Sequence, residues 1–152
     1  MRLKDKVALV TGASQGLGAA IARRFGREGA QVFLGDLKEG EGKVFAAQLQ
    51  AENIKAWFLP LDVASEESWV RACEMVIAKA DRLDVLVNNA GVNIRQPIEE
   101  MSVENLDRML AVNVRGPFLG IKHVLPLMRK AGGGSIINTS SRALDGPATE
   151  RT

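Results

Sequence analysis

The residues that most clearly suggest a ligand-binding site are three glycines near the N-terminus. They lie in the segment Thr11-Gly12-Ala13-Ser14-Gln15-Gly16-Leu17-Gly18, which follows an apolar run and precedes an amphipathic stretch. Glycines between a strand and a helix let the backbone turn tightly and let a phosphate approach the amides of the helix N-terminus. Their spacing is G-x-x-x-G-x-G, not the general fingerprint G-x-G-x-x-G. A glycine-rich turn without a ligand is the alternative, but the position favours a pyrophosphate site.

A second candidate is Asp36, a carboxylate that closes the next apolar run, residues 32–34. A carboxylate at this position can accept hydrogen bonds from ribose hydroxyls, and it repels a 2′-phosphate. Asp36 could instead merely close a turn. Lys38 is close in sequence and could offset the repulsion of a 2′-phosphate. We therefore predict NAD as the cofactor, with NADP as the less favoured alternative.

Short apolar runs alternate with amphipathic stretches and predict the elements that position these residues. We expect strands at 7–10, 32–34, 56–59, 83–87 and 135–137, and helices at 17–29, at 41–52, after Ser65, and from Ser102 to about 129 with a disturbance near Gly116-Pro117. Ser65 and Ser102 are good helix N-caps, because a serine hydroxyl accepts a hydrogen bond from a free amide of the first turn. The alternation predicts parallel strands joined by right-handed crossovers, hence an α/β open sheet.

The composition excludes several classes of function. The chain has 152 residues, 46% of them hydrophobic and 25% charged, which is typical of one soluble globular domain. One Cys allows no internal disulfide and favours the cytoplasm, and one His adds little toward a zinc site. The net charge of +2 comes from scattered residues, and no apolar run is long enough to cross a bilayer. We therefore expect no nucleic-acid or membrane partner and no metal.

Three further motifs carry a family resemblance. They are Asn88-Asn89-Ala90-Gly91 after the fourth strand, Asn113-Val114-Arg115-Gly116 in the last helix, and Ser135-Ile136-Ile137-Asn138-Thr139-Ser140-Ser141 on the fifth strand. Together with the glycine loop they resemble the short-chain dehydrogenase/reductase family, from about residue 4 to residue 141. The resemblance implies a Rossmann-type doubly wound parallel sheet over residues 1–141, followed by a polar tail, 142–152, that departs from the family pattern.

The resemblance also implies a role for each matched residue. The cofactor-binding residues would be Thr11, Gly12, Ser14, Gln15, Gly16, Leu17, Gly18, Asp36, Asp62, Val63, Asn89, Ala90 and Gly91. Among these, the loop glycines would line the pyrophosphate, Asp36 would hold the ribose, and Asp62 and Val63 would meet the adenine. The catalytic residues would be Asn113, which holds a proton-relay water, and Ser141, which orients the substrate carbonyl. Asn113 could instead only satisfy backbone groups in a bent helix, and Ser141 could close an ordinary turn.

Family chemistry is hydride transfer between a nicotinamide and a secondary alcohol or ketone, with a tyrosine in a Tyr-x-x-x-Lys pair as the proton donor. This sequence has no Tyr and no Lys after Lys130. We therefore expect the N-terminal part of an NAD-dependent oxidoreductase, with about five strands, that is impaired or inactive as it stands. The alternatives are a non-catalytic NAD-binding module and a fragment of an NADPH-dependent 3-oxoacyl reductase.

Two expectations concern the surface of such a protein. Family members often pair through the helix that follows the fourth strand, so a homo-oligomer is one option for this chain. In an incomplete sheet the fifth strand would be an uncovered edge. The last helix would then expose apolar residues, for which Leu119, Val124 and Leu127 are the candidates.

Overall fold

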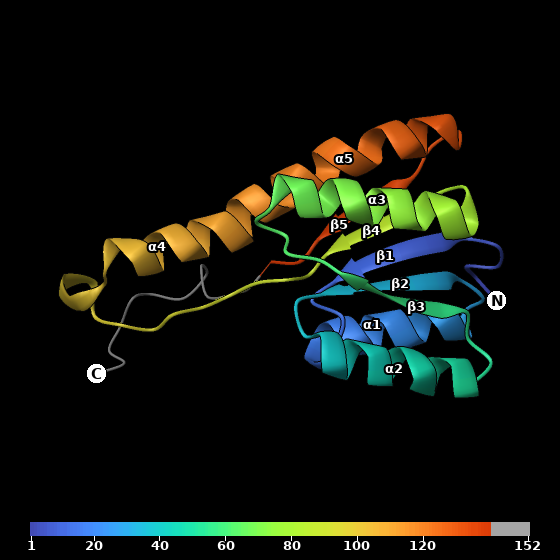
Figure 1. Cartoon of the computed structure of the whole chain (residues 1–152), viewed down its shortest axis with the longest axis horizontal. Coiled ribbons are helices and arrows are strands. Elements are labelled where there is room, and N and C mark those ends of the chain that lie inside the picture. The colour runs from blue at the N-terminus through green and yellow to red at the C-terminus, as the bar shows by residue number, and fades with distance from the viewer. Residues whose placement is uncertain (141–152) are drawn as a thin grey trace.

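The structure, a computed structural model, describes residues 1–140 and contains a parallel five-stranded sheet with helices on both faces (Figure 1). The strands are β1 (Val7–Thr11), β2 (Gln31–Asp36), β3 (Ala56–Pro60), β4 (Val85–Asn88) and β5 (Ser135–Asn138), in the order β3-β2-β1-β4-β5. The chain crosses the sheet between β3 and β4, so the strand order reverses beside β1. The α/β doubly wound sheet is confirmed, whereas the predictions for Ser141 and for the tail 142–152 lie outside the described residues.

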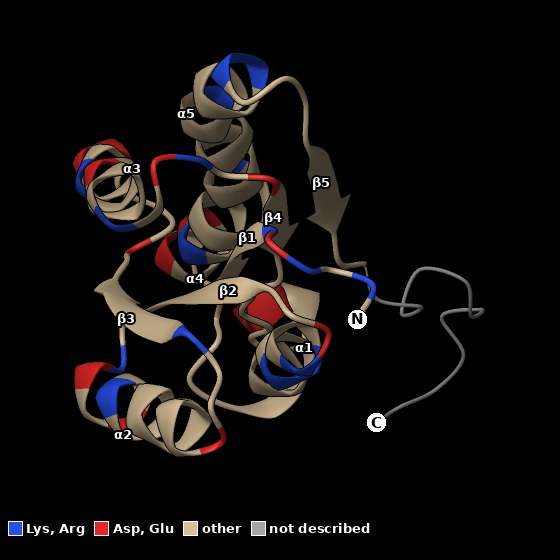
Figure 2. Ribbon diagram, turned by 90° about the vertical axis from the view of Figure 1, so that its right-hand side faces the viewer, with Lys and Arg blue, Asp and Glu red and all other residues tan. Residues whose placement is uncertain are grey.

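Four helices cover the two faces of the sheet. Helices α1 (Gly16–Arg27) and α2 (Glu39–Ala51) lie on one face, and α3 (Glu66–Ala80) and α5 (Gly116–Lys130) lie on the other (Figures 1 and 2). Figure 2 also shows that charged residues of both signs are spread over the helices and connecting loops. No helix within residues 1–140 has the length and apolar character needed to cross a membrane.

The strand sequences are mostly uninterrupted apolar runs because helices cover both faces of the sheet. All five residues of β1 are buried, and the four apolar ones, residues 7–10, alternate between two cores. Leu9 joins Phe33 and Trp69 in the core under α3 and α5, whereas Val10 joins Leu34 in the core under α1 and α2.

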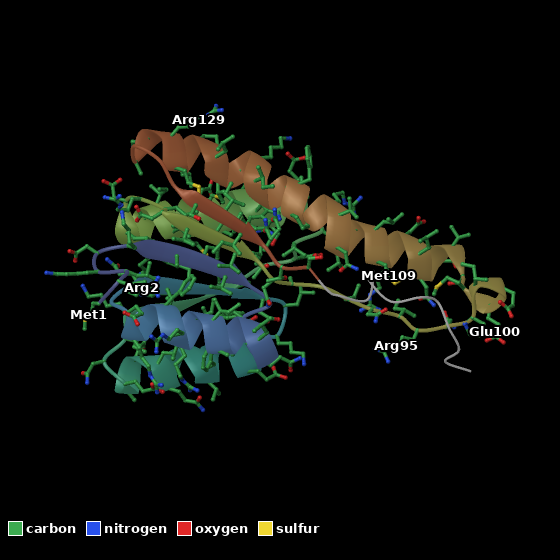
Figure 3. All side chains as sticks on the ribbon, turned by 180° about the vertical axis from the view of Figure 1, so that it is seen from behind. Met1, Arg2, Arg95, Glu100, Met109 and Arg129 are labelled. Carbon is green, nitrogen blue, oxygen red and sulfur yellow. The ribbon has the colours of Figure 1, made fainter. Side chains whose placement is uncertain are left out.

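The expected disturbance in the last helical stretch is a π-helical turn, Ala111–Arg115. It joins helix α4 (Val103–Leu110) to α5 and lies directly before Gly116. A short 3₁₀ helix, Ile98–Glu100, precedes α4. Helix α4 projects beyond the sheet, so that Glu100 and Arg129 mark opposite ends of the α4–α5 segment (Figures 1 and 3).

The prediction of exposed apolar residues on the last helix is wrong in its choice of face. Leu119 and Val124 are buried, and the half-buried Leu127 packs against the core under α3 and α5. The reason is the close approach at Gly120, where a Cβ atom would lie 2.9 Å from the Trp69 ring and 2.8 Å from Asn88 Oδ1. This contact turns that side of α5 toward the core and leaves the opposite side exposed.

At the other edge of the described sheet, β5 pairs only with β4. Its residues Ser135, Ile137 and Asn138 are exposed, as expected for an edge strand.

Candidate functional site

A cleft with a cavity volume of about 640 Å³ opens at the carboxyl ends of β1, β2, β3 and β4. It is lined by Gly12, Gln15, Gly16, Leu17 and Gly18 after β1, by Asp36, Leu37 and Lys38 after β2, by Leu61, Asp62, Val63 and Ala64 after β3, by Asn89, Ala90, Gly91 and Val92 after β4, and by Arg108, Ala111 and Val112 from α4 and the π-helical turn. In open α/β sheets the ligand crevice lies at this edge, where the strand order reverses. Eleven of the predicted cofactor-binding residues, from Gly12 to Gly91, therefore converge on one cleft.

The glycine loop is shaped for a tight turn into α1. Gly12 and Gly16 have positive φ angles of 64° and 58°, which side chains other than glycine rarely adopt. At Gly18 a Cβ atom would lie 2.2 Å from the Gly12 carbonyl oxygen, so only glycine allows α1 to approach β1 this closely. At Gly16 a Cβ atom would meet nothing within 4 Å, so open space lies above the loop.

The N-terminus of α1 has neither a side-chain cap nor an acidic first turn. Its N-cap residue, Gln15, makes no side-chain hydrogen bond to the first turn, and that turn contains no acidic residue. By contrast, Ser65 caps α3 by accepting a hydrogen bond from the Ser68 N–H, and Glu66 and Glu67 follow in its first turn. Free amides and an uncompensated helix dipole at the edge of a cleft suit an anion such as a pyrophosphate.

Asp36 joins the glycine loop to the loop after β2. Its Oδ2 accepts a hydrogen bond from the Ser14 N–H at 2.9 Å, and its Oδ1 accepts one from the Lys38 N–H at 3.0 Å. Lys38 Nζ in turn donates to Gln15 Oε1 at 2.9 Å. A carboxylate offers about four lone-pair sites, so Asp36 keeps acceptor capacity for a ligand hydroxyl in the cleft.

Thr11 lies behind the cleft wall and does not line it. Its buried Oγ1 accepts hydrogen bonds from the N–H groups of Asn89 (3.0 Å) and Ala90 (2.9 Å) and donates to the Val87 carbonyl (3.3 Å). Asn89 Nδ2 returns a hydrogen bond of 3.0 Å to the Thr11 carbonyl. Ser14 is also buried outside the cleft lining. The structure therefore gives Thr11 and Ser14 contacts that hold the loops together.

Asp62 and Val63 line the cleft on a loop that α3 fixes. Asp62 Oδ1 accepts a hydrogen bond from the Ala64 N–H at 2.9 Å, and the Asp62 N–H donates to Ser68 Oγ at 3.0 Å. The Val63 carbonyl accepts the Trp69 Nε1–H at 2.9 Å. The loop is therefore held in place from below by two side chains of α3.

Asn113 lies on the π-helical turn and contacts the loop after β4. Its Oδ1 accepts the Val92 N–H at 2.9 Å, and its Nδ2 donates to the Val92 carbonyl at 2.8 Å. Both polar atoms of the side chain thus satisfy backbone groups, which is the alternative that the sequence left open. Its predicted role toward a water molecule stays a prediction.

Sequence reasoning missed the cleft residues that lie outside the four motifs. They are Leu37, Leu61, Ala64, Val92, Arg108, Ala111 and Val112. Arg108, Ala111 and Val112 have the i, i+3, i+4 spacing of one helix face, just before Asn113. That spacing was the signal available for these three residues.

The fold and the cleft define the class of this protein as a dinucleotide-binding α/β domain. The comparison with protein families agrees: the model described as "short chain dehydrogenase" matches residues 6–150, and the chain belongs to this family.

Named relatives and a solved structure are similar over most of the chain. It is 44% identical over 140 residues to a cyclopentanol dehydrogenase of Comamonas testosteroni and 45% identical over 140 residues to a 2,5-dichloro-2,5-cyclohexadiene-1,4-diol dehydrogenase of Sphingobium indicum. Each match covers 92% of this chain and 56% of the relative, so the chain spans about half the length of these curated relatives. A crystal structure of a metagenomic short-chain oxidoreductase in complex with NADP superposes with a TM-score of 0.90 at 36% identity, covering 97% of this chain and 67% of that one.

Proposed function

We propose that the cleft binds a nicotinamide dinucleotide and that the chain is the cofactor-binding part of a short-chain oxidoreductase. The observation that carries this proposal is the convergence of the glycine loop, the uncapped N-terminus of α1 and Asp36 on one cleft. The volume of about 640 Å³ lies within the range of small-molecule sites, and the open space at Gly16 leaves room for a phosphate. The bound cofactor would supply the hydride chemistry, while these residues bind and orient it.

We propose NAD rather than NADP as the preferred cofactor, because Asp36 adds a negative charge where a 2′-phosphate would lie. The test is isothermal titration calorimetry of NAD and NADP with the wild-type chain and with Asp36→Asn. Asn keeps an acceptor oxygen but removes the charge, so the preference for NAD should fall about tenfold. A wild-type preference for NADP would contradict this proposal and favour the NADPH-dependent alternative. Absence of binding at millimolar NAD and NADP would contradict the dinucleotide site itself.

We propose a secondary alcohol or the corresponding ketone as the substrate class of the whole protein. Support comes from the two relatives, whose names identify them as dehydrogenases of a cyclic alcohol and a cyclic diol. We also propose that this chain turns over slowly or not at all, since its sequence contains no Tyr. The test compares NADH oxidation with cyclic ketones by this chain and by a version extended through a Tyr-x-x-x-Lys helix. Equal turnover by both proteins would overturn the second proposal.

The alternative is a non-catalytic NAD-binding module. The half-buried loops of the cleft and its hydrogen bonds would serve binding equally well without chemistry. NAD should then raise the unfolding temperature of the chain, because a ligand that binds only the folded state stabilises it. This alternative is favoured if NAD binds to the extended protein but supports no turnover with any alcohol or ketone tested.

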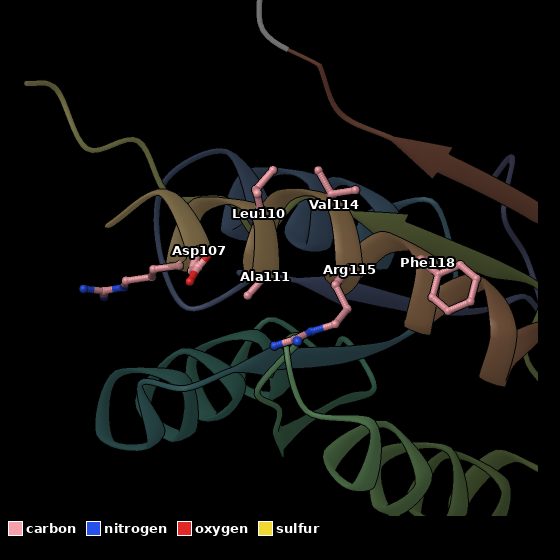
Figure 4. Close-up of a pocket in the computed structure, with 7 residues that line it drawn as sticks. Asp107, Leu110, Ala111, Val114, Arg115 and Phe118 are labelled. Atoms are coloured by element: carbon pink, nitrogen blue, oxygen red, sulfur yellow. The ribbon is translucent and has the colours of Figure 1, made fainter. Parts of the chain in front are cut away.

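We propose that two copies of the chain pair through α4 and α5. Four exposed apolar residues, each four positions apart, form a stripe that we call the α4–α5 face: Leu106, Leu110, Val114 and Phe118. A groove of about 810 Å³ runs along part of it (Figure 4). If two copies meet antiparallel with a twofold axis near Ala111, Asp107 of each copy faces Arg115 of the other, so the charges are complementary.

Light scattering after gel filtration tests the pairing. We expect a dimer for the wild-type chain, a monomer for Val114→Asp, and a dimer for the matched control Val44→Asp, which changes an exposed valine on α2. A wild-type monomer at high concentration, or a Val114→Asp dimer, would contradict this proposal.

A further inference from the structure

Among the arginines of residues 1–140, Arg108 is the one that lines the cleft. Many arginines elsewhere bind a neighbouring carboxylate, namely Arg23, Arg24, Arg27, Arg71 and Arg82. Within residues 1–140, Arg108 makes no such pair, as is also true of Arg2, Arg95, Arg115 and Arg129, so its guanidinium has no carboxylate partner at the cleft. It lies in the last turn of α4, with Ala111 and Val112 one turn further along on the same side.

Residues that follow Arg108 on the same helical segment show which end of the cleft it lies at. Val112 packs against the core that contains Leu61 and Val63. The start of α5 also touches this loop, because a Cβ atom at Gly116 would lie 3.0 Å from the Val63 side chain. The face that carries Arg108 therefore lies beside the loop after β3.

This end of the cleft is apolar and can hold a planar group. Val63, Val112 and Leu37 contribute aliphatic surface, and Leu37 is 71% exposed at the cleft although it is a large apolar residue. The carboxylates there, Asp36 and Asp62, are each fixed by backbone amides and can accept hydrogen bonds from hydroxyl or amino groups. Apolar walls, acceptors and one planar cation suit a purine nucleoside.

We propose that Arg108 stacks its guanidinium plane on the adenine of the bound dinucleotide and forms the outer wall of the adenine pocket. This inference rests on the proposed dinucleotide site. A guanidinium is planar and weakly hydrated, and it stacks on aromatic faces in a way that the ammonium of lysine does not reproduce. Arg108 also lines the groove of the α4–α5 face, so it forms the ridge between the two surfaces.

The test is calorimetric binding of NADH and of ADP-ribose, which carries the adenine but no nicotinamide. Arg108→Ala should weaken both ligands equally, by about 5- to 10-fold. Arg108→Lys keeps the charge but not the plane, so it should recover less than half of the lost affinity on a logarithmic scale. The matched control is Arg129→Ala, which removes the same charge at the far end of α5 (Figure 3) and should bind both ligands like the wild-type chain.

Several results would overturn the role of Arg108. Unchanged affinity in Arg108→Ala would exclude the contact. Full recovery in Arg108→Lys would indicate simple attraction to the phosphates. If Arg108→Ala weakens the affinity for NADPH at least tenfold more than the affinity for NADH, Arg108 contacts a 2′-phosphate and not the adenine. If the wild-type chain binds neither NADH nor ADP-ribose, the proposed dinucleotide site fails first, and this outcome is distinct from the other three.

Discussion

The hydroxyl of Thr11 joins the start of the glycine loop to the loop after β4, so a variant without this hydroxyl tests the role of these contacts. Thr11 is 1% exposed, and Oγ1 takes part in three hydrogen bonds to backbone groups of Val87, Asn89 and Ala90. Thr11→Val replaces the hydroxyl by a methyl group of similar size and keeps the preference for a strand. The substitution therefore removes the hydrogen bonds while it changes the packing little.

The magnitude follows from the three bonds. The two amides donate at 3.0 and 2.9 Å and lose their acceptor in a half-buried setting, whereas the bond to Val87 is longer, 3.3 Å. At about 1 kcal/mol for each well-formed hydrogen bond, and somewhat more where a donor is left unsatisfied, we expect a loss of about 2–3 kcal/mol in the free energy of unfolding. Thr11→Ser keeps the hydroxyl and loses one buried methyl group, which should cost about 1 kcal/mol.

Urea denaturation at 25 °C measures both variants, and calorimetry with ADP-ribose measures the cleft. We expect the order wild type, Thr11→Ser, Thr11→Val in stability, and weaker ADP-ribose binding only in Thr11→Val. If Thr11→Val stays within about 0.5 kcal/mol of the wild type, the hydrogen bonds do not carry the stability assigned to them. If Thr11→Ser is the less stable variant, the methyl group and not the hydroxyl is the important part of the side chain.

Three other predictions concern different parts of the chain. Burial raises the pKa of Asp84, but the hydrogen bonds from Arg82 and from the Val7 amide outweigh this and leave the pKa below its ordinary value. Asp84→Asn should therefore cost about 1–2 kcal/mol in urea denaturation at pH 7, because Arg82 and Lys6 are partly exposed and can turn to water. The difference from the wild type should shrink as the pH falls below the ordinary pKa of 3.8, a trend that a pH-independent difference would refute. Asn113→Ala should cost less than about 1 kcal/mol, because its partner groups can turn to water, yet it should weaken ADP-ribose binding several-fold in calorimetry; unchanged affinity would show that the loop after β4 does not need this contact. Burial, with a smaller contribution from the Glu74 carboxylate, raises the pKa of the Cys73 thiol to about 11, so iodoacetamide at pH 8 should label the unfolded chain much faster than the folded one, and equal rates measured by mass spectrometry would contradict this.

The sequence predicted the sheet well because each strand leaves a local signal. Residues 7–10 and 32–34 are apolar without interruption, and in the structure both runs are buried from both sides. Ser65 and Ser102 mark the starts of α3 and α4, and their hydroxyls accept the first-turn amides as expected.

The orientation of α5 left no such local signal. Leu119 and Phe118 are equally apolar neighbours in the sequence, but one is buried and the other is 62% exposed. The difference depends on Gly120, which lets the helix approach Trp69, a residue 51 positions away in the chain. Arg108 shares a helix face with Ala111 and Val112, but that spacing does not say which face of α4 lies against the cleft, so Arg108 was missed.

Within the motifs, sequence spacing does not separate residues that can touch a ligand from residues that position them. Asn88 and Asn89 are adjacent and chemically identical, yet Asn88 Nδ2 donates to Asn138 Oδ1 on β5 at 2.8 Å, whereas Asn89 Nδ2 donates to the Thr11 carbonyl on β1 at 3.0 Å. The pair therefore ties the end of β4 to the strands on both of its sides. Successive side chains point to opposite faces of a sheet, and accordingly Asn88 lies against Gly120 of α5 whereas Asn89 lies against Gly18 of α1. The floor of the cleft is thus fixed by hydrogen bonds from the side chains of Asn88 and Asn89, and removing either side chain should move Ala90 and Gly91 relative to the glycine loop.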